Sequence, residues 1–246
     1  MIPNNILSLI TFLPLLGMGL VLVTPGNQKK LIQWGAIAFS LLPLGLAVMT
    51  FADYFVSGAA GFKYVEQFEW FPQVKASYHV GVDGISLPLV LLATFLTPLA
   101  MLISLSVEKW VKAFYALFFL MEAATLGVFV SLDLILFFVF YEIGLVPMFF
   151  LINQWGGSNR RYASFKFILY TMFASLGMLL AIQIIGLASG SFDLVYLMSE
   201  AGRPFQQSGK NALNLLGVSS GTWQAIAFFA FALAFALKIP IWPLHT

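Results

Sequence analysis

Seven long apolar stretches, separated by polar segments, limit what this chain can fold into. Each is close to the roughly 20 apolar residues that an α-helix needs to cross the hydrocarbon core of a bilayer. Charged residues make up only 9% of the sequence, against about a quarter in soluble globular domains. We therefore expect an all-α, polytopic membrane helix bundle with about seven transmembrane helices. The expected spans cover residues 6–23, 31–50, 85–105, 113–130, 134–152, 165–188 and 223–241.

Composition also excludes several kinds of site. The sequence contains no cysteine, which rules out disulfides, iron–sulfur clusters and thiolate metal sites within these residues. Any redox cofactor must therefore sit on a partner chain. The net charge is only +2, and the basic residues form no continuous stripe, so nucleic-acid binding is not indicated. No P-loop or dinucleotide-binding motif is present.

The basic residues indicate how the bundle is oriented. Short loops on one side of the spans carry pairs of basic residues, whereas the other side holds two longer segments of mixed charge, about 53–83 and 190–222. The positive-inside rule places the basic side in the cytoplasm. In the two longer segments we expect short interfacial helices or turns. The paired basic residues are Lys29, Lys30, Lys109, Lys112, Arg160 and Arg161.

Four ionisable side chains fall inside the expected spans: Glu122, Glu142, Lys166 and Lys238. Each costs at least about 2.5 kcal/mol near the bilayer centre, so all four are expected to face the bundle interior. At 1.5 Å per residue, Glu122 and Glu142 lie about 15 and 13 Å inside their spans, near mid-membrane. Lys166 lies only about one turn inside its span, where it could equally extend to the headgroups as a topological anchor.

Lys238 is followed by Pro240 and Pro243. Because proline removes a backbone donor and blocks continuation of a helix, the seventh span is expected to be a broken helix, a feature that recurs at ion sites in transporters. The alternative is that the prolines end the helix at the membrane interface, with Lys238 as an interfacial anchor. The residues alone favour neither interpretation.

A buried glutamate and a buried lysine can act together as a proton relay. Burial disfavours the charged form of a lysine, whereas a nearby carboxylate favours it, so moving the carboxylate switches the lysine between proton donor and acceptor. The alternative is a static buried ion pair that holds two helices together.

Several motifs then resemble one family, the chain 4 or subunit M family of respiratory complex I. The run from Phe118 to Ala123 and the pair Tyr141–Glu142 are similar to its fourth and fifth helices. The other similar segments are residues 78–86, 127–129, 132–134, 137–138, 146–147, 155–157, 160–167, 169–171 and 237–246.

This resemblance implies an antiporter-like, proton-pumping subunit in which Glu142 and Lys238 form the proton-handling pair. Lys166 would belong to the hydrated network, and His245 would begin the link to a second half. Glu122 also matches a family position, where its role could be structural.

Members of this family have fourteen helices and about twice this length, so the resemblance covers their first half. Residues 1–110 would form helices 1–3 with an external loop, and residues 111–246 the first proton half-channel. The implied partners are other membrane subunits of complex I, especially neighbouring antiporter-like subunits. NADH, FMN, the iron–sulfur clusters and quinone would be carried by partner subunits of the complex. The residues that make up these motifs favour a bacterial inner (plasma) membrane over a thylakoid or mitochondrial one.

The leading hypothesis is thus a proton-translocating subunit of an NADH:quinone oxidoreductase, without redox chemistry of its own. A subunit of a multi-subunit cation/proton antiporter or of a membrane-bound hydrogenase is the alternative within the same superfamily. From a different class, the chain could be a structural scaffold whose buried charges only support assembly. A solute transporter is disfavoured because few other polar residues lie near mid-membrane.

Overall fold

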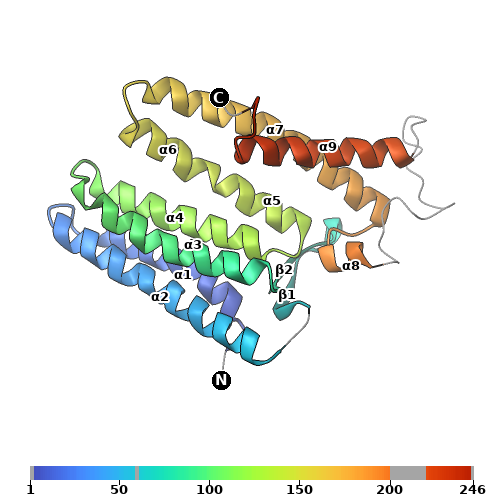
Figure 1. The fold of residues 1–246 in the computed structure, drawn as a ribbon, viewed down its shortest axis with the longest axis horizontal. Helices are drawn as coiled ribbons and strands as arrows, with labels where there is room; N and C mark the ends of the chain where they lie inside the picture. The colour runs from blue at the N-terminus through green and yellow to red at the C-terminus, as the bar shows by residue number, and fades with distance from the viewer. Residues whose placement is uncertain (1–2, 59–60, 200–219, 245–246) are drawn as a thin grey trace.

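The chain folds as a bundle of long, roughly antiparallel helices with a small β-hairpin at one end (Figure 1). The computed structural model describes residues 3–58, 61–199 and 220–244. Within them, seven segments are long and apolar enough to cross a membrane, as the sequence predicts. The helices are α1 (Ile6–Val23), α2 (Lys29–Val56), α3 (Ser86–Ile103), α4 (Val111–Val130), α5 (Leu134–Ile143), α6 (Leu145–Trp155), α7 (Arg160–Ser189), α8 (Leu194–Met198) and α9 (Ser220–Lys238), with short 3₁₀ turns at Pro72–Val74 and Ser104–Ser106.

Helix α4 lies at the centre of this arrangement. It packs against α1, α2 and α3 on one side and against α5 and α6 on the other, while α7 packs against α6 and α9 (Figure 1). More than half of its span, 56%, is buried within the protein, the largest share among the candidate spans. Side chains on α4 can therefore face either of two different environments.

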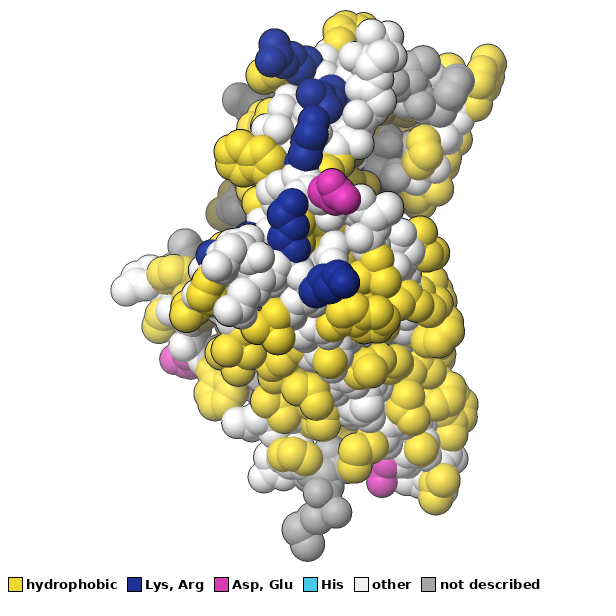
Figure 2. All heavy atoms as spheres, turned by 90° about the vertical axis from the view of Figure 1, so that its left-hand side faces the viewer, with side chains coloured by type: hydrophobic (Ala, Val, Ile, Leu, Met, Phe, Trp, Pro, Cys, Tyr) yellow, Lys and Arg dark blue, Asp and Glu magenta, His cyan; other side chains and the backbone are white. Residues whose placement is uncertain are grey.

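The two ends of the bundle differ in charge. Lys and Arg side chains gather along the end where α2, α4 and α7 begin (Figure 2). Hydrophobic side chains are prominent below them in the same view. The paired basic residues therefore lie at one end of the bundle, and we refer to the two ends as the basic end and the hairpin end.

The segment before α3 forms a β-hairpin, so the expectation of interfacial helices or turns is wrong there. Strands β1 (Lys63–Phe71) and β2 (Ala76–Val82) pair antiparallel, with Phe68 opposite Tyr78. Aromatic and β-branched residues favour the pleated backbone over a helix. The second long segment does contain a short helix, α8, and residues 200–219 of it lie outside the described residues.

Glu66 of the hairpin caps the first helix. Its Oε1 accepts hydrogen bonds from the backbone N–H groups of Leu7, at 2.9 Å, and Ser8, at 3.2 Å, and its Oε2 accepts one from the Ser8 hydroxyl. A carboxylate at this position satisfies N–H groups that the first helical turn leaves free. The hairpin is therefore tied to the start of α1.

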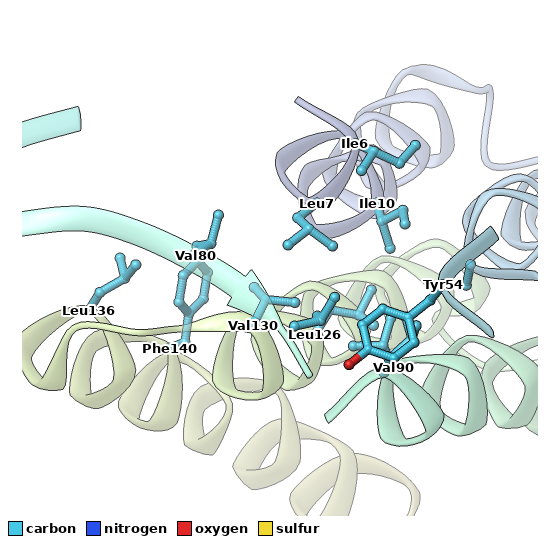
Figure 3. Packing of buried hydrophobic residues seen from close by; sticks show 13 residues of the cluster. Ile6, Leu7, Ile10, Tyr54, Val80, Val90, Leu126, Val130, Leu136 and Phe140 are labelled. Carbon is cyan, nitrogen blue, oxygen red and sulfur yellow. The ribbon is translucent and has the colours of Figure 1, made fainter. Parts of the chain in front are cut away.

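The main core joins the hairpin to the N-terminal helices and to α4 and α5 (Figure 3). Leu126 of α4 packs in this cluster with Ile10 of α1 and Val90 of α3, and all three side chains are fully buried. Gly127 of α4 faces the ring of Phe140 of α5 so closely that any Cβ atom would overlap it. This close approach of α4 and α5 fixes the position of Glu142 along the bundle axis, because Glu142 follows Phe140 by two residues.

Candidate functional site

The fifth predicted span runs as one segment from Leu134 to Trp155, as expected from the sequence. Just after Glu142, α5 ends at Ile143 and α6 begins at Leu145; Gly144 between them keeps helical dihedral angles, φ −63° and ψ −21°. Pro147 has no N–H to donate to the carbonyl of Ile143, and it stands in the first turn of α6, where that loss is tolerated. We refer to this missing hydrogen bond as the α5–α6 break.

The other end of α5 is firmly held. Asp133 is fully buried, and its Oδ1 accepts hydrogen bonds from the N–H groups of Ile135, at 2.9 Å, and Leu136, at 3.2 Å. Its Oδ2 accepts a bond from the N–H of Ser77 in the hairpin at 3.0 Å. Asp133 is therefore the N-cap of the helix that carries Glu142, anchored to the hairpin end of the bundle.

A second anchor joins the same region to α8. His79 Nδ1 of the hairpin lies 2.9 Å from Asp193 Oδ2, and the N–H of Leu132 donates to the carbonyl of His79 at 2.8 Å. The N–H of Leu194 in turn donates to the carbonyl of Leu132 at 2.8 Å. The hairpin, the α4–α5 turn and the start of α8 are thus joined by hydrogen bonds. Helix α5 begins at this joined region, and the α5–α6 break lies at its other end.

Lys238 is the last residue of α9, immediately before the turn that contains Pro240. Its ammonium donates a hydrogen bond to the carbonyl of Tyr141 at 3.3 Å and lies 3.3 Å from the centroid of the Tyr141 ring. The Tyr141 hydroxyl donates to the carbonyl of Ala234, one turn before Lys238, at 3.1 Å. Tyr141 therefore joins α5 to α9, a role that the sequence analysis missed, since Tyr141 entered it only as part of a motif.

Glu142 lies next to this contact but is not in direct contact with Lys238. Its Oε1 is buried and has no hydrogen-bond partner among the described residues. The carboxylate acts electrostatically on both Lys238 and the Tyr141 hydroxyl. Among the described residues, His79 and Asp193 form the one ion pair with an N–O distance within 4 Å. The distance between the Glu142 carboxylate and the Lys238 ammonium is therefore more than 4 Å.

Lys238 lines three cavities. The first, about 320 Å³, lies between α7 and α9 and includes Lys166. The second, about 210 Å³, lies between α4 and the α5–α6 break and includes Gly144. The third, about 540 Å³, is bounded by α4, α5 and α9 and includes Tyr141. Lys238 therefore borders both the cavity next to α7 and the cavity next to the α5–α6 break.

Lys166 faces the same cavity as Lys238. It lies on α7 between Tyr162 and Tyr170, with its Nζ 5.8 Å from each ring centroid. Because α7 already begins at Arg160, Lys166 lies about 9 Å along the helix, deeper than the single turn expected from the sequence. The structure thus places Lys166 and Lys238 on one cavity, whereas Glu142, like Glu122, is absent from the lining of all three.

The remaining two candidate residues are not part of this group. Glu122 is only 3% exposed, but it lines none of the three cavities that reach Lys238. His245 lies outside the described residues. Among the described residues there is no cluster of His, Asp and Glu side chains that could hold a metal ion.

Known proteins resemble the chain along almost its whole length. The family described as "NADH:quinone oxidoreductase/Mrp antiporter, TM" matches residues 131–246. NADH-quinone oxidoreductase subunit M of Rhodobacter capsulatus is 39% identical over 99% of this chain and 47% of the relative. NAD(P)H-quinone oxidoreductase chain 4-3 of Nostoc sp. is 38% identical over 98% of this chain and 40% of the relative.

Among solved structures, one chain of respiratory complex I from Thermus thermophilus superposes with a TM-score of 0.78. It is 28% identical, and the match covers 97% of this chain and 45% of that one. The chain therefore spans less than half the length of the relatives it matches. The bundle described above corresponds to one half of such a protein.

Proposed function

We propose that this chain, which is similar along nearly its whole length to subunit M and chain 4 of NAD(P)H-quinone oxidoreductases, forms the first proton half-channel of an NADH:quinone oxidoreductase, respiratory complex I. A full-length subunit of this kind would pass protons across a bacterial inner membrane while partner subunits transfer electrons from NADH to quinone. NADH, FMN, the iron–sulfur clusters and quinone would all be bound by those partners.

One observation carries this proposal: the ammonium of Lys238 lies at the end of a helix, beside Glu142 and at the junction of three cavities. Backbone that is irregular at membrane depth is tolerated where it lines protein or water-filled space. Both the α5–α6 break and the end of α9 meet this condition, because residues on each side of them line the cavities.

The geometry supports a relay with two positions for Lys238. In the position observed, the ammonium is held by the carbonyl and ring of Tyr141, more than 4 Å from the Glu142 carboxylate. Approach of the two groups would favour the charged lysine, and separation would favour release of its proton. The break at Gly144 gives Glu142 a backbone that can shift, while Asp133 keeps the other end of α5 fixed.

Lys166 would deliver protons to Lys238 from the basic end. Both side chains line the cavity between α7 and α9, and a few water molecules would fit in its volume of about 320 Å³. His245 would continue the path toward the second half of the protein. We also propose the division into residues 1–110 and 111–246; the family match covers residues 131–246 of the second part.

A cation/proton antiporter subunit is the second candidate, since the matching family includes Mrp antiporters. Whole-chain similarity to quinone oxidoreductase subunits favours complex I. In a scaffold, by contrast, Glu142 and Lys238 would serve assembly alone.

The test is proton pumping by membrane vesicles that contain the full-length subunit with Glu142→Gln or Lys238→Ala. Glu69→Gln and Lys30→Ala, at exposed positions, are matched controls. We expect the assembled complex to lose pumping and coupled quinone reduction with the first two variants and to keep both with the controls. If the first two variants assemble and pump normally, the charges are structural and the relay is wrong.

A further inference from the structure

A cavity of about 420 Å³ lies at the basic end of the bundle, between the α1–α2 turn and the start of α4. Figure 2 looks onto this end, where basic side chains gather. Three charged residues line the cavity: Lys29, Glu108 and Lys112. Lys166 and Lys238 do not line it, so the cavity is separate from the space around the proposed relay.

The cavity lies at the depth of the lipid headgroups. Helix α4 has 20 residues, which at 1.5 Å per residue give about 30 Å, the thickness of the hydrocarbon core of a bilayer. Val111, its first residue, is therefore at the edge of that core, and Glu108 lies just outside it. The neighbouring spans agree with this level, because α1 ends at Val23 and α2 begins at Lys29.

The wall of the cavity belongs to the packed part of the bundle. Val111 is buried in one cluster with Val21 of α1 and Ile32 of α2. The side chain of Lys112 lies against the α1–α2 turn, since a Cβ atom on Gly26 would be 3.6 Å from its Cδ. The charged groups are therefore carried by residues whose backbone the neighbouring helices hold in place.

The three charges do not neutralise one another. Within residues 3–58, 61–199 and 220–244, neither lysine ammonium lies within 4 Å of the Glu108 carboxylate, because the ion pair at that distance is His79–Asp193. None of the three side chains forms a hydrogen bond to the rest of this described part either. A single cavity thus presents two cations and a separate anion, which a ligand with both a negative and a positive group would complement.

Apolar side chains complete the lining. Trp110 is 76% exposed and Leu22 is 47% exposed, and both line the cavity. An indole ring is favoured at the membrane–water interface, where its apolar body and polar N–H meet matching surroundings. A ligand with a charged head and apolar chains therefore fits this lining better than a small soluble anion does.

We propose that this cavity binds the headgroup of an aminophospholipid, a lipid that carries a phosphate and a primary ammonium. Lys29 and Lys112 bind the phosphate, as basic pockets between transmembrane helices do, and the Glu108 carboxylate accepts hydrogen bonds from the ammonium. Leu22 and Trp110 contact the beginning of the acyl chains. The site takes no part in the relay, so it stands or falls independently of the proposed transport function.

Glu108 makes the site selective among headgroups. Phosphatidylglycerol offers no cation to the carboxylate, and phosphatidylcholine offers a quaternary ammonium without an N–H to donate. Phosphatidylethanolamine supplies both the charge and the donors. Specificity of this kind comes from leaving a charged group of the site unpaired when the wrong ligand binds.

The test is photo-crosslinking of the assembled complex that contains the full-length subunit. The complex is reconstituted in phosphatidylcholine vesicles with a small fraction of one photoactivatable probe, which is phosphatidylethanolamine, phosphatidylglycerol or phosphatidylcholine with the reactive group near the glycerol end of an acyl chain. Mass spectrometry measures labelling of residues 22–29 and 108–113. We expect the ethanolamine probe to label these residues about two- to fivefold more than the others, which corresponds to roughly 0.4 to 1 kcal/mol for an exposed charge pair. Equal labelling by the three probes would mean ordinary lipid contact and would overturn the proposal.

Charge variants test the role of each group. Lys29→Ala and Lys112→Ala should reduce labelling by the ethanolamine probe, whereas Lys112→Arg keeps the charge and should retain it. Lys30→Ala is the matched control, since Lys30 is adjacent in sequence but absent from the lining. Unchanged labelling in both alanine variants of the lining lysines would exclude them as phosphate ligands.

Two further arms test the choice of ligand. Glu108→Gln should abolish the preference for the ethanolamine probe over the glycerol probe, and a preference that survives would exclude the carboxylate as its cause. Inorganic phosphate in excess should leave labelling unchanged. If it suppresses labelling as strongly as unlabelled phosphatidylethanolamine does, the cavity is a site for soluble anions and the proposal is wrong.

Discussion

Tyr141 holds Lys238 at two points, through its backbone carbonyl and through the face of its ring, each 3.3 Å from the ammonium. The carbonyl belongs to the last turn of α5, and the ring carries a hydroxyl that is bonded to α9. Lys238 is therefore tied to the fifth span by the residue directly before Glu142.

Variants of Tyr141 should separate these contacts. Tyr141→Phe keeps the ring and the carbonyl but removes the hydroxyl bond to Ala234, and we expect a loss of stability of about 1 kcal/mol with nearly normal pumping. Tyr141→Leu also removes the ring, and a cation over an aromatic ring is stabilised by about 0.5 to 1 kcal/mol at an exposed position such as that of Lys238. We expect pumping by vesicles to fall several-fold in that variant, with the complex still assembled. Equal pumping by the two variants would show that the ring has no role in holding Lys238.

Closing the break in the fifth span should slow proton transfer. Pro147→Ala supplies an N–H for the carbonyl of Ile143 and would let α5 continue into α6 as one regular helix. We expect the complex to assemble normally and to pump more slowly, since Glu142 would lose its adjustable backbone. Pro25→Ala, in the turn between α1 and α2, is the control. Unchanged pumping in Pro147→Ala would indicate that the break does not take part in the relay.

An added methyl group should destabilise the protein where α4 and α5 approach each other at Gly127. Gly127→Ala places a methyl group into the ring of Phe140, and overpacking of this kind costs about 1 to 3 kcal/mol. Gly177→Ala adds the same group to α7 where no atom lies within 4 Å, so it should be neutral or slightly stabilising. Thermal stability of the two purified variants in lipid measures the difference. Similar melting temperatures would contradict the packing described for Gly127.

The start of α3 should loosen in acid. Partial burial raises the pKa of Asp83, but this effect is outweighed by hydrogen bonds from the N–H groups of Ser86 and Ile85 and from the Ser86 hydroxyl, so the pKa is held below its ordinary value. A lowered pKa in the folded state gives stability that is present above the ordinary value of about 4 and is lost as the pH falls below it.

Hydrogen exchange of the first turn of α3 measures this effect. Below about pH 4, exchange should accelerate in the wild-type protein. In Asp83→Asn, exchange should follow only the intrinsic pH dependence of amide hydrogen exchange. The same acid-induced acceleration in both proteins would mean that another group is responsible.

The seven spans could be predicted from the sequence because the length of an apolar stretch alone determines whether it can cross a bilayer. Hydropathy does not register which backbone carbonyl lacks a donor, so the missing hydrogen bond of the α5–α6 break was overlooked, although Pro147 was its signal in the sequence. The hairpin was missed because its aromatic residues also suit an interfacial helix. Pairing between Phe68 and Tyr78 depends on a partner strand, which a local pattern does not reveal.

The candidate site was only partly visible in the sequence. Glu142, Lys166 and Lys238 are conspicuous because charge is rare in such spans. The contact of Lys238 with Tyr141 depends on how helices pack against one another, and a sequence pattern on one helix does not specify its neighbour.

The cap that Glu66 provides for α1 also bears on how the chain is made. The bonded residues Leu7 and Glu66 are 59 positions apart, so at about 5 to 20 residues per second the ribosome needs roughly 3 to 12 s to supply the cap after the first helix has emerged. During that interval the first helix lacks the cap that Glu66 provides. The start of α1 therefore reaches its final hydrogen bonding only after α2 and the hairpin have been made.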